Sequence, residues 1–453
     1  MDPPDIVRAA YAELVVTDLE RARSFWVDLL GLVVTRADAD ALYLRGYDEL
    51  THHNLILTEG PEPGAARLAF RVRTAADLDR AEAFYAALGS RTARAPAGAT
   101  PGVGESVLAE DPLGFTVEFF FAADHSPRLQ QRYDLRRGAE PARLDHFNIV
   151  VPHVRAAYDY YTSLGFGLAE TIEDGDTLYA AWMFRKQTVH DVAFTGGDGP
   201  RLHHLGFFAH ESHQVLRICD ILGSLGEESR IERGPGRHGV SNAFYVYLRD
   251  PDGHRVELYT SDYFTGDPDH PVLRWSVRDP RRRDFWGNPV IPSWYTEAST
   301  VLDLGRRPRP LLPEQQPAEV RVGADGFTQL RTPPPEAPAR ASGGACLLLR
   351  PALEDVLRAM RREVHLGGGG GAGRDGGGDR RPVMLEGARG CGRLTGEGHG
   401  GERGGDEQGA GEGADGLGHG AGPFSDVDRS GLVTSMSLRQ RPADRATAPH
   451  PGG

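Results

Sequence analysis

The sequence predicts an α+β protein built from four β-α-β-β-β modules that are arranged as two tandem pairs. Four times along the chain, a stretch with strand-like alternation of apolar residues is followed by a helix-like stretch that ends in Leu-Gly. The second and fourth copies end in similar strands, each of which begins at an Asp-Pro-x-Gly turn and contains one glutamate. Because the first pair recurs as the second at nearly constant spacing, the chain is a tandem duplication of a duplicated unit.

The four copies follow one another in the order strand, helix and further short strands. The strand-helix parts of the first pair span residues 13–31 and 68–89, and those of the second pair span residues 146–165 and 204–226. Each helical stretch carries apolar or aromatic residues three to four positions apart, and the glycine that follows is a helix stop signal.

The composition excludes several classes of protein. The chain has 453 residues, which is enough for two or three domains with a buried core. A formal net charge of −13 gives no general reason to bind nucleic acid or an anionic membrane, so we expect a small-molecule partner. The three cysteines are too scattered for a disulfide framework, and neither a signal peptide nor an apolar stretch of about 18 residues is present. We therefore predict a cytoplasmic protein.

We divide the chain into four segments. Residues 1–130 form the first pair of modules, 140–265 the second pair, 266–330 a C-terminal lid segment and 331–453 a low-complexity tail. The tail is dominated by Gly, Arg, Asp and Glu. We expect it to be disordered, because such a composition cannot bury enough apolar surface to offset the entropy of ordering.

Three residues in the second pair form a candidate metal site. His146 and His204 begin the first strands of the third and fourth copies, and Glu257 lies in the last strand of the fourth copy. Two imidazoles and one carboxylate on one face of an octahedron leave three open positions, the arrangement that non-haem Fe(II) oxygenases use. The corresponding residues of the first pair are Tyr11, Leu68 and Glu118, so we expect metal in the second pair alone.

The chain contains 17 histidines, and a single strand histidine is more often structural than a ligand. The repeat changes that balance, because three ligand-type residues occupy equivalent module positions in one half and two of them are replaced in the other. The ligand set does not distinguish Fe(II) from Mn(II).

Several stretches resemble the vicinal oxygen chelate superfamily and, within it, the type I extradiol ring-cleaving dioxygenases, most closely the group that cleaves homoprotocatechuate (3,4-dihydroxyphenylacetate). The likeness covers residues 10–298 with a trace at 322–327. The stretches that carry it are residues 144–152, 186–191, 202–204, 232–245, 250–259 and 282–289.

The resemblance implies roles for the metal site and its catalytic neighbours. His146, His204 and Glu257 would bind Fe(II), with Mn(II) as the alternative, and His190 would be the acid/base beside catechol and oxygen. An imidazole suits this role because its usual pKa is about 6.5. The resemblance also implies that Tyr247 hydrogen-bonds the metal-bound catecholate oxygen, and His238 is a second candidate for proton handling.

The resemblance also implies a substrate pocket. Asn148 and Trp182 would line it, and Arg282 and Arg283, with Arg233 as a further candidate, would bind the acetate group through their planar guanidinium forks. From the residues alone, we would prefer to interpret His190 as a surface turn residue. Core packing explains Trp182 nearly as well and would also explain Tyr247, and the arginine run is at even odds a solvated turn.

The resulting hypothesis is extradiol cleavage of 3,4-dihydroxyphenylacetate with O₂, giving 5-carboxymethyl-2-hydroxymuconate semialdehyde. Two alternatives remain open: an extradiol dioxygenase for another catechol, and a non-enzymatic binding module of the same fold. The resemblance further implies a homotetramer, and we expect neither a nucleic-acid nor a membrane partner.

Overall fold

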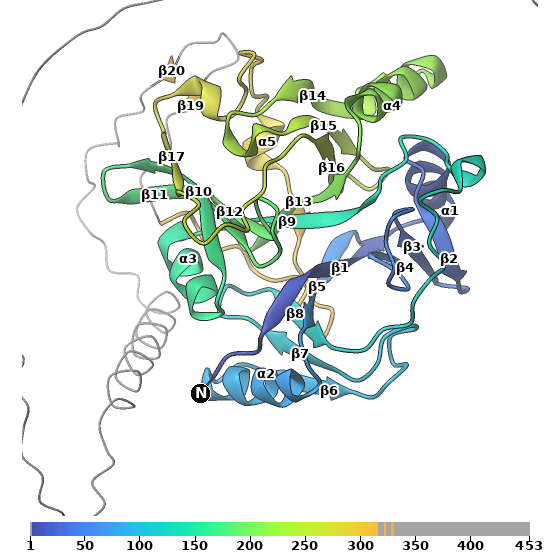
Figure 1. Cartoon of the computed structure of the whole chain (residues 1–453), viewed down its shortest axis with the longest axis vertical. Coiled ribbons are helices and arrows are strands. Elements are labelled where there is room, and N and C mark those ends of the chain that lie inside the picture. The colour runs from blue at the N-terminus through green and yellow to red at the C-terminus, as the bar shows by residue number, and fades with distance from the viewer. Residues whose placement is uncertain (1, 316–320, 323–327, 330–453) are drawn as a thin grey trace, which may run out of the picture. The chain divides into compact units, whose positions relative to one another are not determined.

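The computed structural model describes residues 2–315, 321–322 and 328–329 (Figure 1). The predicted disordered tail, residues 331–453, lies outside the described residues. Residues 316–320, 323–327 and 330, at the end of the predicted lid segment, also lie outside them. Within the part of the chain that is described, no helix is both long enough and apolar enough to cross a membrane.

The first two modules share an eight-stranded sheet. The first module contains β1 (Ile6–Val16), α1 (Leu19–Arg23), a π-helical turn (Ser24–Leu29), β2 (Val33–Ala37), β3 (Ala41–Arg45) and β4 (Leu55–Glu59). The second contains β5 (Gly64–Val72), α2 (Ala76–Ala87), β6 (Thr92–Ala95), β7 (Ser106–Glu110) and β8 (Thr116–Phe120). The strand order is β2-β3-β4-β1-β5-β8-β7-β6, so the modules join where β1 pairs with β5 in antiparallel fashion.

The third and fourth modules repeat this plan in a second sheet. The third contains β9 (Arg143–Val151), α3 (Val154–Ser163), β10 (Gly167–Asp174), β11 (Thr177–Phe184) and β12 (Val192–Gly196). The fourth contains β13 (Arg201–Phe208), α4 (Ser212–Leu225), β14 (Ile231–Arg237), β15 (Phe244–Arg249) and β16 (Arg255–Thr260). The strand order is β14-β15-β16-β13-β9-β12-β11-β10-β17, and β9 pairs with β13 as β1 pairs with β5. The predicted fold of four modules in two pairs is confirmed.

Buried apolar side chains form one continuous core through both halves. The ring of Phe70 on β5 lies 5.7 Å from the ring of Phe147 on β9. A polar contact supports the same junction, because the indole Nε1 of Trp26 donates to Asp250 Oδ2 over 3.1 Å. The second pair of modules is therefore held by the first pair as well as by its own core.

The segment after β16 crosses the second sheet and returns to the first. It contains β17 (Leu273–Ser276), which extends the sheet beside β10, α5 (Ser293–Thr296), and β18 (Ser299–Thr300), which pairs with β13. Leu302 then donates its backbone N–H to Ala65 of β5 and accepts a hydrogen bond from the hydroxyl of Thr116 on β8. The short strands β19 (Arg321–Val322) and β20 (Thr328–Gln329) pair only with each other among the described strands.

Candidate metal centre and substrate pocket

Three neighbouring strands of the second sheet carry the predicted metal ligands. His146 lies on β9, His204 on β13 and Glu257 on β16, and these strands are adjacent in the order β16-β13-β9. Gly206 of β13 pairs with His146 on one side and with Glu257 on the other. His204 precedes Gly206 by two positions and shares its face of the strand. Cross-strand pairing therefore brings the three side chains to one face of the sheet.

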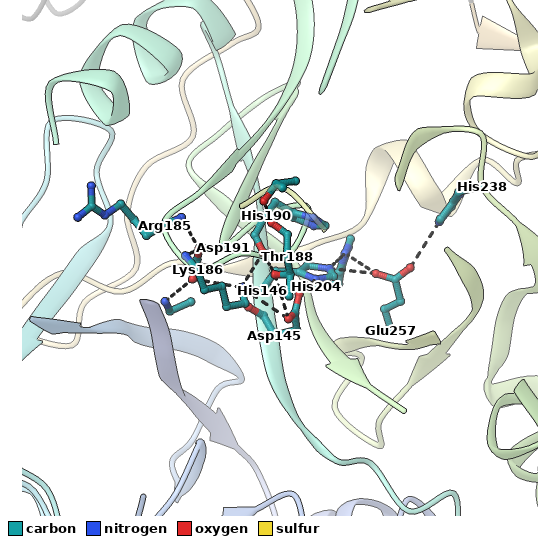
Figure 2. A network of polar contacts seen from close by, with 12 residues as sticks. Asp145, His146, Arg185, Lys186, Thr188, His190, Asp191, His204, His238 and Glu257 are labelled. Atoms are coloured by element: carbon teal, nitrogen blue, oxygen red, sulfur yellow. Dashed lines mark hydrogen bonds and ion pairs between the residues drawn. The ribbon is translucent and has the colours of Figure 1, made fainter. Parts of the chain in front are cut away.

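The ligand atoms of these side chains converge on one point. His146 Nε2 lies 3.1 Å from Glu257 Oε2 and 3.3 Å from His204 Nε2, and His204 Nε2 lies 3.2 Å from the same oxygen. All three side chains are buried, and Figure 2 shows them side by side. Within the described ranges, they form the one cluster of His, Cys, Asp and Glu whose ligand atoms all lie within 4.8 Å of one another.

Hydrogen bonds fix which ring nitrogen of His204 faces this point. His203 donates from Nε2 to the carbonyl oxygen of Trp294 over 3.0 Å, so the Nδ1 of a neutral His203 carries a lone pair. That Nδ1 accepts from His204 Nδ1 over 2.7 Å, which leaves the lone pair of His204 on Nε2. Burial lowers the pKa of His203 and also lowers that of His204, to about 4, so both rings are neutral, as ligation requires.

His146 is oriented by the carboxylate of the preceding residue. Its Nδ1 donates to Asp145 Oδ2 over 3.2 Å, which directs the lone pair of Nε2 toward Glu257. Burial favours the neutral acid at Glu257, but the imidazoles of His146, His204 and His238 outweigh it and hold the pKa of Glu257 well below its usual range. Glu257 is therefore an ionised ligand.

The residues present fit a divalent transition metal. Two imidazole lone pairs and one carboxylate charge that meet at a buried point repel one another unless a cation lies between them. Two neutral imidazoles and one carboxylate are the ligand set of mononuclear non-haem Fe(II) sites with open positions. The donor set thus fits Fe(II) or Mn(II).

His190 lies directly beside the ligands, on the connection between β11 and β12. Its ring centroid is 3.9 Å from that of His146, with the rings tilted by 36°. The ring is buried, and its Nδ1 has no hydrogen-bond partner among the described residues. Burial places the pKa of His190 well below its usual value, so the ring is a neutral proton acceptor.

Tyr247 and His238 form a hydrogen-bonded pair on the other side of the ligands. His238 Nδ1 donates to the carbonyl oxygen of Arg283 over 2.5 Å, so Nε2 is the acceptor in the neutral ring. The Tyr247 hydroxyl lies 2.9 Å from that Nε2 and donates to it. Burial lowers the pKa of His238 and, together with the charge of Glu257, places that of Tyr247 well above its usual value. In Figure 2 the His238 side chain approaches Glu257 from the side opposite His204.

All the predicted site residues line one cavity next to the metal ligands. Arg233 donates to the carbonyl oxygen of Arg283 over 2.9 Å and lies over the ring of Trp294. The Asn148 amide oxygen accepts from Thr195 over 3.3 Å. The predicted residues in the cavity wall are His146, Asn148, Trp182, His190, His204, Arg233, His238, Tyr247, Glu257, Arg282 and Arg283.

Sequence reasoning missed other residues of the same wall. Trp294 on α5 packs against the ring of Tyr247, with centroids 4.5 Å apart, and its carbonyl oxygen sets the tautomer of His203. Tyr259 follows Glu257 by two positions and lies 5.3 Å from the ring of His146. Strand alternation from Glu257 would have indicated Tyr259, whereas nothing local in the sequence marks Trp294.

The first pair of modules holds an ion pair at the equivalent position. Tyr11 and Glu118 both pair with Ala69, as His146 and Glu257 both pair with Gly206. The counterpart of His204 is therefore Arg67, two positions before Ala69. The sequence comparison had assigned Leu68, and that assignment is wrong by one residue, because cross-strand pairing makes Ala69, rather than Phe70, the counterpart of Gly206.

Arg67 occupies the place that a metal would take. Its Nη1 donates to Glu118 Oε2 over 2.7 Å, and the Tyr11 hydroxyl donates to the same oxygen over 2.5 Å. Arg67 also lies 2.7 Å from Glu13. The guanidinium thus supplies the positive charge that the buried Glu118 needs.

The comparisons with known proteins agree with this geometry. The sequence profile of the "Glyoxalase/Bleomycin resistance protein/Dioxygenase superfamily" matches residues 8–119 and 143–258. The chain is 57% identical to homoprotocatechuate 2,3-dioxygenase from Arthrobacter globiformis, with a TM-score of 0.68 over 69% of this chain and 97% of that one. It is 28% identical to a manganese-dependent 2,3-dihydroxybiphenyl 1,2-dioxygenase from Geobacillus genomosp. 3, over 63% of this chain and 95% of the relative.

A further solved structure is an anaerobic complex of the Brevibacterium fuscum homoprotocatechuate 2,3-dioxygenase with 3,4-dihydroxyphenylacetate. The chain is 56% identical to it, with a TM-score of 0.68 over 69% of this chain and 98% of that one.

Proposed function

The chain belongs to the glyoxalase/bleomycin resistance protein/dioxygenase superfamily, and on that premise we propose that it is an extradiol dioxygenase that cleaves 3,4-dihydroxyphenylacetate. The bond next to the diol opens, both atoms of O₂ enter the product, and the product is 5-carboxymethyl-2-hydroxymuconate semialdehyde. The observation that carries the proposal is the buried triad of His146, His204 and Glu257 with the neutral His190 beside it.

The triad would hold Fe(II) or Mn(II). The metal, when bound, supplies a centre that brings catechol and O₂ together and carries electrons between them. The triad's hydrogen bonds to Asp145 and His203 keep both imidazole lone pairs on Nε2, so the ligands are set in place before metal and substrate arrive.

Side chains on opposite sides of the cavity have different roles toward the catechol. His190, neutral and buried, accepts a catechol proton and returns it later in the reaction. Tyr247, held by His238, provides a hydroxyl beside the triad that hydrogen-bonds a catechol oxygen. Trp294 and Trp182 wall the cavity and limit the access of water.

Recognition of the acetate group falls to the cationic wall of the cavity. Arg233, Arg282 and Arg283 all line it, and a guanidinium pairs with a carboxylate through two parallel hydrogen bonds. Asn148 lies on the same strand face as His146 and contributes an amide group to the wall.

A pair of substrates tests this assignment. 4-Ethylcatechol has the same diol as 3,4-dihydroxyphenylacetate and a side chain of similar size without charge. We expect kcat/KM to be about 100-fold lower for 4-ethylcatechol, since charge-assisted hydrogen bonds of a few kcal/mol are lost. Equal values for the two substrates would overturn the acetate assignment, whereas the extradiol assignment would stand.

We also propose that the enzyme is cytoplasmic, as its composition suggests, and a homotetramer, as the sequence resemblance suggests. Light scattering of the purified protein tests the tetramer, and a mass of one chain would exclude it.

A further inference from the structure

The chain contains one lysine, Lys186; every other member of the 51 Lys and Arg residues is an arginine. Cationic positions throughout the chain, buried or exposed, thus accept a guanidinium. The single lysine therefore marks a position at which the surrounding structure requires an ammonium group rather than a guanidinium. Lysine and arginine differ in shape, because an ammonium group is a compact donor of three hydrogen bonds and a guanidinium is a wide planar fork.

The ammonium group of Lys186 lies among three acceptors close to the metal ligands. Its Nζ donates to the carbonyl oxygens of Asp145 and His190, each over 2.7 Å, and lies 3.1 Å from Asp191 Oδ1. Figure 2 shows Lys186 between Asp191 and Asp145. Three acceptors around one nitrogen match the three protons of an ammonium group.

Two of these acceptors belong to residues that place imidazoles. Asp145 precedes His146 and binds its Nδ1, and the ring of His190 stacks 3.9 Å from that of His146. Since His190 Nδ1 has no partner among the described residues, the backbone has to hold this ring in position. Lys186 binds the His190 backbone carbonyl over 2.7 Å, and the Thr188 hydroxyl donates to the same oxygen over a longer distance, 3.4 Å.

We propose that Lys186 is a positioning residue that fixes His190 relative to His146 by binding the backbone carbonyls of His190 and Asp145 with one ammonium group. The inference rests on the proposed function, in which His190 handles the protons of the catechol. Lys186 does not line the cavity, so it acts through His190 rather than on the substrate.

Asp191, the third acceptor, explains why a guanidinium does not fit at this position. The two oxygens of Asp191 accept backbone N–H groups of Ala9, Arg185 and Lys186, over 2.6 to 3.0 Å. Asp191 is therefore fixed by both halves of the protein and cannot move back to admit a larger cation. An arginine here would place its planar fork where the two carbonyl oxygens and the carboxylate approach within 3.1 Å of a single atom.

The first test compares Lys186→Arg, which keeps the charge, with Lys186→Met, which removes it. The matched control is Arg185→Met, because Arg185 makes a similar number of hydrogen bonds, to Ile6, Gly165 and Asp5, but none to a site residue. We expect Lys186→Arg to retain its metal content and its KM within about threefold while kcat falls about 100-fold, as a displaced acid/base predicts. The control should keep its kcat. A kcat of Lys186→Arg within about threefold of the wild type would overturn the proposal.

A double-mutant cycle separates positioning from a merely structural role. If Lys186 acts through His190, Lys186→Arg should reduce kcat less than about threefold once His190 is replaced by Asn. The same 100-fold loss in both backgrounds would contradict the proposal, because it would show that Lys186 acts independently of His190.

A measurement on the metal-free protein tests the role of Lys186 independently of the proposed function. The ring ¹H–¹³C NMR signal of His190 is identified by its loss in His190→Asn. It should shift in both Lys186 variants and stay in place in Arg185→Met. An inactive wild type would overturn the proposed function, whereas an unmoved His190 signal would overturn the role of Lys186.

Discussion

Gly206 supports the metal centre without contributing a ligand. It pairs with both His146 and Glu257, and a Cβ atom at this position would lie 2.1 Å from His146 Cε1. The imidazole of His146 cannot turn aside freely, since it is bound to Asp145 and packed against His190. A glycine here is what lets the two outer ligands meet across the middle strand.

We expect Gly206→Ala to weaken metal binding about 10- to 100-fold, the effect of displacing a ligand's support. Anaerobic titration with Fe(II) against a competing chelator measures it. Gly223→Ala is the control, because nothing lies within 4 Å of a Cβ atom built at that helical glycine. Equal affinity of Gly206→Ala and the control would contradict this account of the strand.

Single residues were predictable where the repeat placed them. The two histidines and the glutamate followed from comparing the halves of the chain, and the structure brings their ligand atoms together. His190, Arg282 and Arg283 followed only from the resemblance, because they lie outside the β-strands, in segments whose path no periodicity reveals. The assignment of Leu68 in place of Arg67 was wrong because the pairing of Tyr11 with Ala69 sets the register, and hydrophobic alternation alone does not reveal that pairing.

The two Asp-Pro-x-Gly turns are equivalent elements with different surroundings. Asp111 Oδ1 accepts the backbone N–H groups of Leu113 and Phe115, and Asp250 Oδ1 does the same within its own turn. Asp250 Oδ2 also accepts from Trp26, whereas Asp111 Oδ2 has no partner in the described part of the chain. Burial raises the pKa of Asp111 to about 7.

The raised pKa of Asp111 predicts a pH dependence of stability. Asp111 titrates near 3.9 in the unfolded chain, so between about pH 4 and pH 7 the folded state binds a proton that the unfolded state has lost. The contribution of Asp111 to the free energy of unfolding therefore falls as pH rises through this window, by up to about 4 kcal/mol at about 1.4 kcal/mol per unit.

We expect Asp111→Asn to remove this loss. Urea unfolding of both proteins at pH 5 and pH 8 should show that the variant gains stability relative to the wild type at the higher pH. A stability difference that is the same at both pH values would contradict the buried protonation of Asp111.

The elements themselves were largely predictable, and their longest-range contacts were not. The four strand-helix repeats follow from hydrophobic periodicity and glycine stops, and the helix that ends before Gly226 stops at a residue with φ of 70°. The first helix is interrupted by a π-helical turn that carries Trp26 into contact with Asp250 of the other half. Such a partner, far away in sequence, cannot be read from local pattern.

At the scale of the whole molecule, one half carries a metal site and the other carries an ion pair in its place. In the first half, Arg67 binds Glu118 and Glu13, which are almost fully buried. We therefore expect metal loading to saturate at one equivalent per chain and Glu257→Gln to abolish it. Elemental analysis after anaerobic loading and desalting checks this stoichiometry, and two equivalents per chain would contradict it.

Replacing Arg67, the buried cation of the first half, should lower stability and leave metal binding intact. Arg67→Met leaves the buried Glu118 without its cation, whereas Glu13 keeps its ion pair with Arg306, and the change should lower the free energy of unfolding by about 3–5 kcal/mol. Metal affinity of the folded variant should stay within about threefold of the wild type, since the partners of Arg67 among the described residues, Tyr11, Glu13 and Glu118, all belong to the first half. A stable variant with impaired metal binding would show that the halves are coupled in a way this structure does not contain.

The duplication was visible in the sequence because both pairs preserve the same order of elements. The sequence did not reveal the route of residues 299–312, which run from β13 of the second sheet to β5 and β8 of the first. Irregular segments of this kind carry no periodic signal. The predicted disorder of residues 331–453 lies outside the described residues and stays a prediction.

The central claim is that the second pair of modules performs extradiol cleavage. The most direct test loads the purified chain anaerobically with Fe(II), adds 3,4-dihydroxyphenylacetate, admits O₂ and follows oxygen uptake together with the product by mass spectrometry. We predict one O₂ consumed per substrate and a yellow ring-opened semialdehyde that carries both oxygen atoms. Oxygen uptake with a product opened between the two hydroxyl groups, or no uptake by a chain that has bound iron, would contradict the account.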